Sequence, residues 1–295
     1  MQYKVLLFGS NGMLGQAIKR EFIKYDFIEV VCVAHDGADY NFDFTDDKAV
    51  KECFNSVQPD IVINTAAIVN LQLCEDNVAL AYKVNARFCA VLTDCAQANG
   101  SYLIHISTDH FYHGDSRKKH AEADPIVLLN EYARTKYLGE RLTQTYSNSL
   151  VIRTNIVGFR LKKEMPTFLE WVVKTIKQNE KMTLFDDFYT SSIFVDELAC
   201  ILIKIIEKRP LGIMNIASST VSSKKEFILA LSEALFGRLP LYDVGSVNYS
   251  LVVKRADSLG LDVSKAEKIL ECKMPDLYTV IKDIQKSYRR IENEI

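Results

Sequence analysis

The chain has 295 residues, of which 48% are hydrophobic and 25% are charged, and its formal net charge is −2. This length supports a substantial core, in one large domain or in two closely joined lobes. The balanced charge argues against a broad surface for nucleic acid or anionic membranes, and no apolar run approaches the roughly 18 residues that a membrane span requires.

Strand-like and helix-like segments alternate through the first half of the chain. Apolar strands are expected at 3–9, 27–33, 60–67, 102–107 and 149–154. Helices are expected between them at 13–24, 47–57, 76–98 and 129–145. Strands that are apolar throughout and separated by helices are typical of a parallel sheet covered on both faces. We therefore predict an α/β fold with a doubly wound, Rossmann-type parallel sheet.

After about residue 156 the alternation becomes less regular. Helices are expected near 167–178, 195–208, 223–235 and 277–290, with a strand at 212–217. No linker rich in Pro, Gly or Ser separates the two halves of the sequence. We expect a dinucleotide-binding domain over 1–155 and a smaller, mainly substrate-binding lobe over 156–295, some elements of which return to the first domain. A small ligand is expected in a cleft between the two.

Cysteine usage and the N-terminus indicate where the protein works. The seven cysteines are scattered and form no CxxC pair, which favours reduced core thiols over disulfides or a metal site. The opening segment MQYKVLLFGS is typical of a buried first strand rather than a secretory signal. We expect a cytoplasmic protein without bound metal, which acts on a small molecule and not on nucleic acid or membranes.

Three glycines follow the first strand at GxxGxxG spacing, namely Gly9, Gly12 and Gly15 in FGSNGMLGQ. A tight strand-to-helix turn requires glycine, and so does close approach of the backbone to a pyrophosphate. The N-terminus of the helix then offers free N–H groups and a positive dipole end to the phosphates. The strand, the helix and the N-terminal position all favour dinucleotide binding over a merely tight turn. The remaining residues of this turn that we expect to contact the cofactor are Asn11, Met13 and Leu14.

The choice between NAD(H) and NADP(H) depends on the end of the second strand. An acid there binds the ribose 2′-hydroxyl of NAD, but this chain reads VCVAHDG, so the acid is missing or displaced. His35 could face a 2′-phosphate, with help from Lys19 or Arg20, which favours NADP(H) slightly. Asp43 either lies at the adenine edge or caps a helix. Further cofactor contacts are expected from Phe44, Ala66 and Ala67.

Tyr132 and Lys136 lie four residues apart on the helix expected at 129–145, so they share one face. Alone, this spacing is more typical of a surface pair on an ordinary helix. Thr108, however, follows the strand at 102–107, and ligands bind at the carboxyl ends of parallel strands. An enzyme that reduces a ketone needs an acid to protonate the forming alkoxide, and a nearby ammonium favours the phenolate form of a tyrosine. Tyr132 as acid, Lys136 as its partner and Thr108 as carbonyl ligand fit that chemistry.

The chain resembles the extended short-chain dehydrogenases/reductases, and within them the dTDP-4-dehydrorhamnose reductase family. The matching segments follow in family order from residue 4 to about 270: FGSNGMLGQ, QPDIVINTAA, ALAYKVNA, HISTDHFYHG, NEYARTKYLGE, VIRTNIVG, VDELA and SLGLDVSKAEKIL. The resemblance implies an NAD(P)H-dependent reductase of a nucleotide-linked 4-keto-6-deoxy sugar, with Thr108, Tyr132 and Lys136 as its catalytic set. It also implies that Asp109 and His110 face the substrate, and that a homodimer is possible.

The departures from the family pattern fall on the segments that face the sugar. The family usually has Tyr where this chain has His110, and Trp at the sugar-facing position where Ile156 stands. Its D-x-Q-x-G-x-P-T segment appears here as DDFYTSS, without the Gly and the Pro. The reaction class is therefore better supported than the particular sugar.

Two other functions remain open at this stage. A nucleotide-sugar epimerase would retain tightly bound NAD, whereas a reductase exchanges its cofactor at each turnover. A non-catalytic regulatory subunit of the same fold is also possible, although the intact Thr108, Tyr132 and Lys136 set speaks against it. A dehydratase is disfavoured because His110 stands where that chemistry needs a carboxylate.

Overall fold

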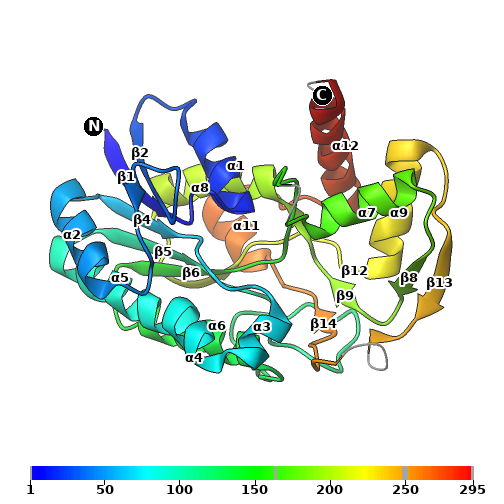
Figure 1. Cartoon of the computed structure of the whole chain (residues 1–295), viewed down its shortest axis with the longest axis horizontal. Helices are drawn as coiled ribbons and strands as arrows, with labels where there is room; N and C mark the ends of the chain where they lie inside the picture. The colour runs from blue at the N-terminus through cyan, green and yellow to red at the C-terminus, as the bar shows by residue number, and fades with distance from the viewer. Residues whose placement is uncertain (1, 163–164, 248–251, 294–295) are drawn as a thin grey trace. The chain divides into compact units, whose positions relative to one another are not determined.

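The computed structural model of the chain describes residues 2–162, 165–247 and 252–293 (Figure 1). They form two compact units, each built from separate stretches of the sequence. The first unit comprises residues 1–108, 128–153 and 199–214, and the second comprises 109–127, 154–198 and 215–295. Dinucleotide binding by the first unit and substrate binding by the second stay predictions.

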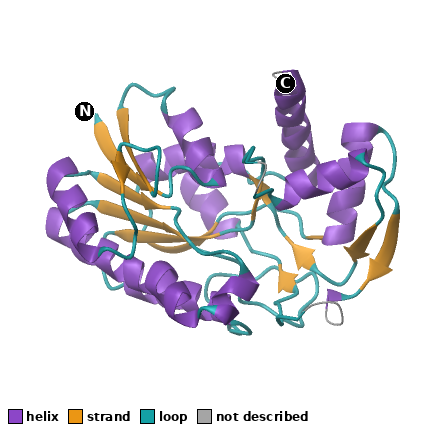
Figure 2. Cartoon of the chain, in the orientation of Figure 1, coloured by secondary structure: helices purple, strands orange, loops and turns teal. Residues whose placement is uncertain are grey.

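The first unit contains a seven-stranded sheet with the order β11-β6-β5-β4-β1-β2-β3. Its strands are β1 (Tyr3–Phe8), β2 (Ile28–Ala34), β3 (Tyr40–Asn41), β4 (Ile61–Asn64), β5 (Tyr102–Ile106), β6 (Ser149–Arg153) and β11 (Gly212–Asn215). The pairings β1–β2, β2–β3, β1–β4, β4–β5 and β5–β6 are all parallel. The predicted doubly wound α/β fold is confirmed, because helices cover both faces of this sheet (Figure 2).

The helices of this unit are α1 (Met13–Phe22), α2 (Asp47–Val57), α3 (Leu71–Asp76), α4 (Val78–Tyr82), the π-helical η1 (Lys83–Arg87), α5 (Phe88–Asn99), α6 (Glu131–Thr143) and most of α8 (Val195–Lys208). Helices α1 and α8 lie on one face of the sheet, and α2, α5 and α6 lie on the other. The long helical region expected over 76–98 is confirmed, because α4, η1 and α5 follow one another without a break from Val78 to Asn99. Asn77 ends α3 and caps α4 by accepting the N–H of Leu80.

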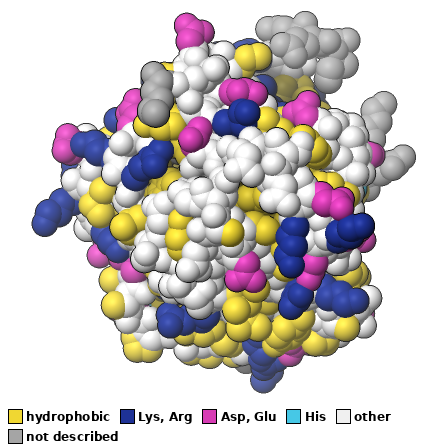
Figure 3. Space-filling view, turned by 90° about the vertical axis from the view of Figure 1, so that its left-hand side faces the viewer, with side chains coloured by type: hydrophobic (Ala, Val, Ile, Leu, Met, Phe, Trp, Pro, Cys, Tyr) yellow, Lys and Arg dark blue, Asp and Glu magenta, His cyan; other side chains and the backbone are white. Residues whose placement is uncertain are grey.

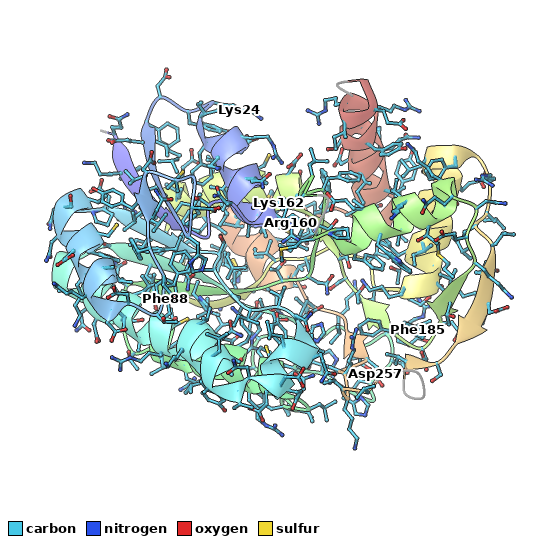
Figure 4. The ribbon with its side chains drawn as sticks, in the orientation of Figure 1. Lys24, Phe88, Arg160, Lys162, Phe185 and Asp257 are labelled. Atoms are coloured by element: carbon cyan, nitrogen blue, oxygen red, sulfur yellow. The ribbon has the colours of Figure 1, made fainter. Side chains whose placement is uncertain are left out.

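Aromatic side chains fill the space between the sheet and the helices α2 and α5. Phe8 of β1 lies 5.3 Å from Phe88 and 5.9 Å from Phe44 between ring centroids. Phe44 stacks on Phe88 at 5.1 Å, and the latter is labelled in Figure 4. This cluster fixes the strand that leads directly into the glycine-rich turn.

The second unit is built from short strands and helices. They are β7 (Ile156–Val157), α7 (Phe168–Lys177), β8 (Met182–Phe185), β9 (Tyr189–Thr190), β10 (Ile193–Phe194), β12 (Ser222–Ser223), α9 (Lys224–Phe236), β13 (Tyr242–Gly245), β14 (Ser258–Leu259), α11 (Ser264–Leu270) and α12 (Leu277–Asn293). Helices α7 and α9 each begin with a capping box, made by Thr167 with Glu170 and by Ser223 with Glu226. These reciprocal bonds satisfy N–H groups at both helix starts, which is why the helices begin within a residue of the predicted positions.

The surface of the molecule carries both signs of charge. Figure 3 shows basic, acidic and hydrophobic side chains interspersed over one face, without a continuous field of one sign. No helix within the described part of the chain has both the length and the apolar character that crossing a bilayer requires.

Candidate functional site: a nucleotide turn and a buried tyrosine–lysine helix

The turn between β1 and α1 and the first turn of α1 each contain a position that admits only glycine. Gly9 has φ +79°, and a Cβ there would lie 2.7 Å from Thr65 Oγ1 and 2.9 Å from the backbone nitrogen of Ala66. A Cβ on Gly15 would lie 2.3 Å from the carbonyl oxygen of Gly9. Gly12, which has no side chain, is the N-cap residue of α1. The start of this helix is therefore approachable by a phosphate group, as dinucleotide binding requires.

The end of β4 is bonded to the same turn. Thr65 donates its hydroxyl to the carbonyl oxygen of Phe8 at 2.7 Å, and Asn64 accepts the N–H of Ala66 at 3.0 Å. Ala66 is buried and Ala67 is partly exposed. These bonds bring two of the predicted cofactor residues beside the glycine turn. The glycine turn and the end of β4 are thus held together by hydrogen bonds.

Residues expected at the adenosine end of the cofactor also lie near one another. The exposed ring of His35 lies 4.9 Å from the ring of Phe44 between centroids. Asn11 donates to the carbonyl oxygen of Asp36 at 2.5 Å, and Lys19 Nζ lies 3.4 Å from Asn11 Oδ1. A histidine and an ammonium group therefore flank the end of β2, where NAD-binding proteins carry an acid.

The two alternatives for Asp43 are resolved in part. Asp46, and not Asp43, is the N-cap of α2, because its carboxylate accepts the N–H groups of Lys48 and Ala49. Asp43 instead accepts the N–H of Thr45 at 2.8 Å, and this bond lowers the pKa of its carboxyl group. The capping alternative is therefore wrong, and Asp43 is an exposed, ionised group next to Phe44.

Helix α6 carries the tyrosine and the lysine on a buried face. Its N-cap, Asn130, accepts the N–H of Ala133 at 2.8 Å, which fixes where the helix starts. Tyr132 is only 8% exposed and packs in a cluster with Cys74 and Ala81. Lys136, one turn later, is 2% exposed. A solvated surface pair is therefore excluded, because both side chains are withdrawn from water.

The ammonium group of Lys136 reaches the end of β5. Its Nζ donates to the carbonyl oxygen of Ile106 at 2.7 Å and lies 3.4 Å from His105 Nε2. Burial lowers the pKa of Lys136, against the opposing effects of Cys89 and Glu140. Thr108, two residues after Ile106, is 3% exposed. The turn of α6 that carries Tyr132 and Lys136 is thus bonded to the end of β5, two residues before Thr108.

A buried ion pair holds α6 against the strands. Glu140 accepts from Arg153 Nε at 3.0 Å and from its terminal nitrogen at 2.8 Å. The two side chains are 0% and 3% exposed. Ser107 donates its hydroxyl to the same carboxylate at 2.6 Å. The ends of β5 and β6 are therefore tied to the helix one turn beyond Lys136.

The remaining predicted residues belong to the second unit. Asp109 is 1% exposed, and its carboxylate accepts the amide of Asn155 at 2.8 Å. Asn155 in turn accepts the hydroxyl of Ser192 at 2.6 Å. Ile156, the next residue, is partly exposed and pairs with Ile193 between β7 and β10. Asp109 and Ile156 are therefore joined through Asn155, which the sequence did not single out.

A buried cation of the second unit, Lys224, was also missed. Lys224 Nζ lies 4.5 Å from the centroid of the Phe168 ring, and burial lowers the pKa of Lys224 to about 8. Burial, with contributions from Arg255 and Lys224, lowers the pKa of His110 to about 3, so that His110 is neutral at pH 7. A lysine at the first position of a helix usually lies in solvent, so no pattern in the sequence marked Lys224.

Metal ligands are not grouped in the part of the chain that the structure describes, where no cluster of three or more His, Cys, Asp or Glu could hold an ion. His113, which lies three residues after His110, has its Nδ1 3.0 Å from a carboxylate oxygen of Asp257 (labelled in Figure 4). The carboxylate of Asp257 also accepts the N–H of Gly114 at 2.8 Å. His113 therefore forms part of a hydrogen-bonded loop.

The sequence and the fold both have known relatives. The profile of the family described as RmlD substrate binding domain matches residues 3–290. The chain is 29% identical over 231 residues to the spore coat polysaccharide biosynthesis protein SpsK of Bacillus subtilis, with 78% of each chain covered. It is 25% identical over 296 residues to a dTDP-4-dehydrorhamnose reductase of Aggregatibacter actinomycetemcomitans, with 96% of this chain and 98% of that one covered.

A solved structure agrees with these sequence relatives. The crystal structure of a hypothetical dTDP-4-dehydrorhamnose reductase from Sulfolobus tokodaii superposes with a TM-score of 0.83 at 29% identity. The superposition covers 95% of this chain and 99% of that chain. The similarity therefore extends over both units, and not over the seven-stranded sheet alone.

Proposed function

This chain belongs to the family of the RmlD substrate binding domain, and on that premise we propose that it is an NAD(P)H-dependent reductase of a nucleotide-linked 4-keto-6-deoxy sugar. Such reductases serve deoxysugar and cell-surface polysaccharide biosynthesis. The observation that carries the proposal is the bond from Lys136 Nζ to Ile106. This bond joins the turn of α6 that carries Tyr132, the proposed acid, to the end of β5, which leads to Thr108, the proposed carbonyl ligand. Both lie in the unit that also contains the glycine turn.

The chain's own residues have distinct roles in this reaction. Tyr132 donates its phenolic proton to the oxygen that becomes the product hydroxyl, and Thr108 holds that oxygen by a hydrogen bond. Lys136 stabilises the phenolate and binds the ribose next to the nicotinamide. The bound nicotinamide supplies the hydride, which goes to C4 of the sugar. Burial of these groups strengthens their electrostatic coupling, because little water screens them.

The protein uses a nicotinamide cofactor, and we propose a slight preference for NADP(H). Support comes from His35 and Lys19, which bring positive or neutral groups to the end of β2. An exposed histidine can donate a hydrogen bond to a 2′-phosphate, or pair with it, whereas no acid occupies its place to bind the 2′-hydroxyl. The ratio of kcat/KM for NADPH and NADH measures the preference directly.

Recognition of the nucleotide-sugar is assigned to the second unit. Asp109, His110 and Ile156 are the proposed substrate contacts, and the neutral state of His110 supports a hydrogen bond to a sugar hydroxyl rather than an ion pair. Ile156, an apolar residue where the family has Trp, favours a sugar position without aromatic stacking. Homodimerisation and a cytoplasmic location stay predictions.

A panel of keto-sugar nucleotides tests the function. Each is mixed with the protein and NADPH or NADH, and the loss of reduced-cofactor absorbance is followed. A reductase consumes one cofactor per sugar and leaves the purified protein without stoichiometric bound cofactor. If the purified protein instead retains one NAD per chain and interconverts sugars without net absorbance change, it is an epimerase and the proposal is wrong.

A further inference from the structure

A buried histidine lies behind the proposed catalytic lysine, and the reaction as described above does not use it. His105 of β5 is 1% exposed, and its ring contacts three elements of the first unit. Its Nδ1 lies 3.2 Å from Asn64 Nδ2, its Nε2 lies 3.4 Å from Lys136 Nζ, and Cys89 Sγ lies 3.7 Å from Nδ1. Burial and the charge of Lys136 keep the pKa of His105 well below its usual value, so the ring is neutral.

The hydrogen bonds around Asn64 determine which nitrogen of His105 carries the proton. The amide nitrogen of an asparagine cannot accept a hydrogen bond, so the backbone N–H of Ala66 identifies the atom of Asn64 at 3.0 Å as Oδ1. The atom that faces His105 Nδ1 is then the amide nitrogen, which is a donor. Nδ1 must accept that bond and carries no proton. A neutral ring protonated at one nitrogen therefore carries its proton on Nε2.

This tautomer directs an N–H group at the amine of Lys136. An ammonium group has three donors and no acceptor, so it cannot form a hydrogen bond with another N–H. A neutral amine has a lone pair, and it can accept the N–H of His105 while still donating to Ile106 at 2.7 Å. A proton that leaves Lys136 therefore leaves a lone pair on Nζ, which the N–H of His105 can bond.

The other ionisable groups around Lys136 oppose this effect or are neutral. Glu140 favours the ammonium form, but its carboxylate is engaged by Arg153 and Ser107. Burial raises the pKa of the Cys89 thiol to about 11, so it carries no negative charge at neutral pH. Tyr132 lies one turn before Lys136 on α6. The imidazole is thus the neighbour that bonds selectively to the neutral amine.

We propose that His105, locked by Asn64 as the Nε2–H tautomer, is a positioning residue that stabilises the neutral amine of Lys136 and so sets the pH range in which the Tyr132–Lys136 pair works. The proposal rests on the proposed function for its kinetic consequence. Its structural content, the tautomer and the response of Lys136, does not depend on any turnover.

The tautomer is measured first, in the unmodified full-length protein. Two-bond ¹⁵N–¹H correlation spectra of ¹⁵N-histidine-labelled protein distinguish a protonated from an unprotonated ring nitrogen. His105 is assigned as the signal that disappears in His105→Gln. If His105→Gln does not fold, His105 is assigned as the signal that remains in variants of each of the other four histidines, His35, His110, His113 and His120. The proposal predicts an unprotonated Nδ1 and a protonated Nε2, and the opposite tautomer would overturn it.

The response of Lys136 is measured next, by titrating the ¹³Cε signal of labelled lysine. In His105→Gln the side-chain oxygen can accept from the ammonium, so the pKa of Lys136 rises by about one unit, the effect of one buried hydrogen bond. His113→Gln, the same exchange in the other unit, leaves it unchanged. A folded His105→Gln protein with an unchanged Lys136 titration contradicts the proposal.

The kinetic consequence separates this inference from the function itself. In an active reductase, the alkaline limb of the kcat profile shifts upward by the same amount in His105→Gln, and KM changes little. A purely structural role for His105 would instead lower the thermal midpoint without moving the limb. If the NMR results hold but no keto-sugar is reduced, the proposed function fails while the assignment of His105 stands.

Discussion

The side-chain nitrogen of Lys136 lies 2.7 Å from the carbonyl oxygen of Ile106, the last residue of β5. This bond connects a helix that follows the strand by more than twenty residues to the strand's carboxyl end. The bond holds Lys136 in a buried position, and burial lowers the pKa of its amine. It also places the turn of α6 that contains Tyr132 at the carboxyl end of β5, and the carboxyl ends of parallel strands are where α/β sheets bind ligands. The predictions below concern the parts that hold this arrangement.

Gly15→Ala should weaken cofactor binding and destabilise the protein by about 1–3 kcal/mol, the usual effect of an overpacked methyl group. The new Cβ would lie 2.3 Å from the carbonyl oxygen of Gly9, so the turn between β1 and α1 must shift. Gly139→Ala is a matched control, since its Cβ would meet the carbonyl oxygen of Asn85 at the same 2.3 Å. Thermal melting and cofactor titration compare the two. A comparable loss of cofactor affinity in both variants would argue against a special role for the Gly15 turn.

Arg153→Met should destabilise the protein by about 3–5 kcal/mol, because it leaves the carboxylate of Glu140 buried without its cation. Both side chains are almost fully withdrawn from solvent. The double variant Arg153→Met/Glu140→Met removes both charges and should recover much of this loss. Urea unfolding gives the free energies. Equal destabilisation in the single and the double variant would show that packing, and not the unpaired charge, dominates.

The contribution of Lys224 to stability should increase as the pH rises from about 8 to 10.5. Burial lowers the pKa of Lys224 from 10.5 to about 8, so in this range the unfolded chain binds more protons at this residue than the folded chain does. The thermal midpoint of the wild type relative to Lys224→Met should therefore rise with pH. Lys225→Met, which removes the neighbouring cation, serves as the control. A flat difference across this range would contradict the depressed pKa.

His35→Glu should shift cofactor preference toward NADH. A carboxylate at the end of β2 repels a 2′-phosphate and can bind the 2′-hydroxyl, so kcat/KM for NADPH should fall by about tenfold, equivalent to one close charge pair at the surface. The value for NADH should fall less or rise. If both cofactors respond equally, His35 does not contact the ribose.

Most of the first unit could be predicted from the sequence, because its buried strands are continuous apolar runs bounded by clear turn residues. The strands expected at 3–9 and 102–107 appear as β1 and β5, each shortened by one residue at the carboxyl end. The helical region expected over 76–98 appears as α4, η1 and α5, but the separate helix α3 was not expected, and the side chains of Asn70 and Asn77 cap the starts of α3 and α4. Local polar bonds of this kind leave the apolar pattern unchanged, so periodicity cannot reveal them.

The candidate site was predictable where its residues follow a strand or share a helix face. Gly9, Thr108 and Lys136 were identified in this way. Lys224 and Asn155 were not, because they become neighbours of Asp109 only through folding of short, irregular elements. His105 could be seen only as a strand residue, and its bond to Lys136 depends on the register of β5 against α6.

The most direct test of the central claim is the turnover of Tyr132→Phe with a keto-sugar nucleotide that the wild type reduces. Loss of the general acid should lower kcat by roughly two to four orders of magnitude. Because the phenyl ring keeps its packing against Cys74 and Ala81, cofactor affinity should change little. A variant that retains full turnover would contradict the assignment of Tyr132 as the proton donor.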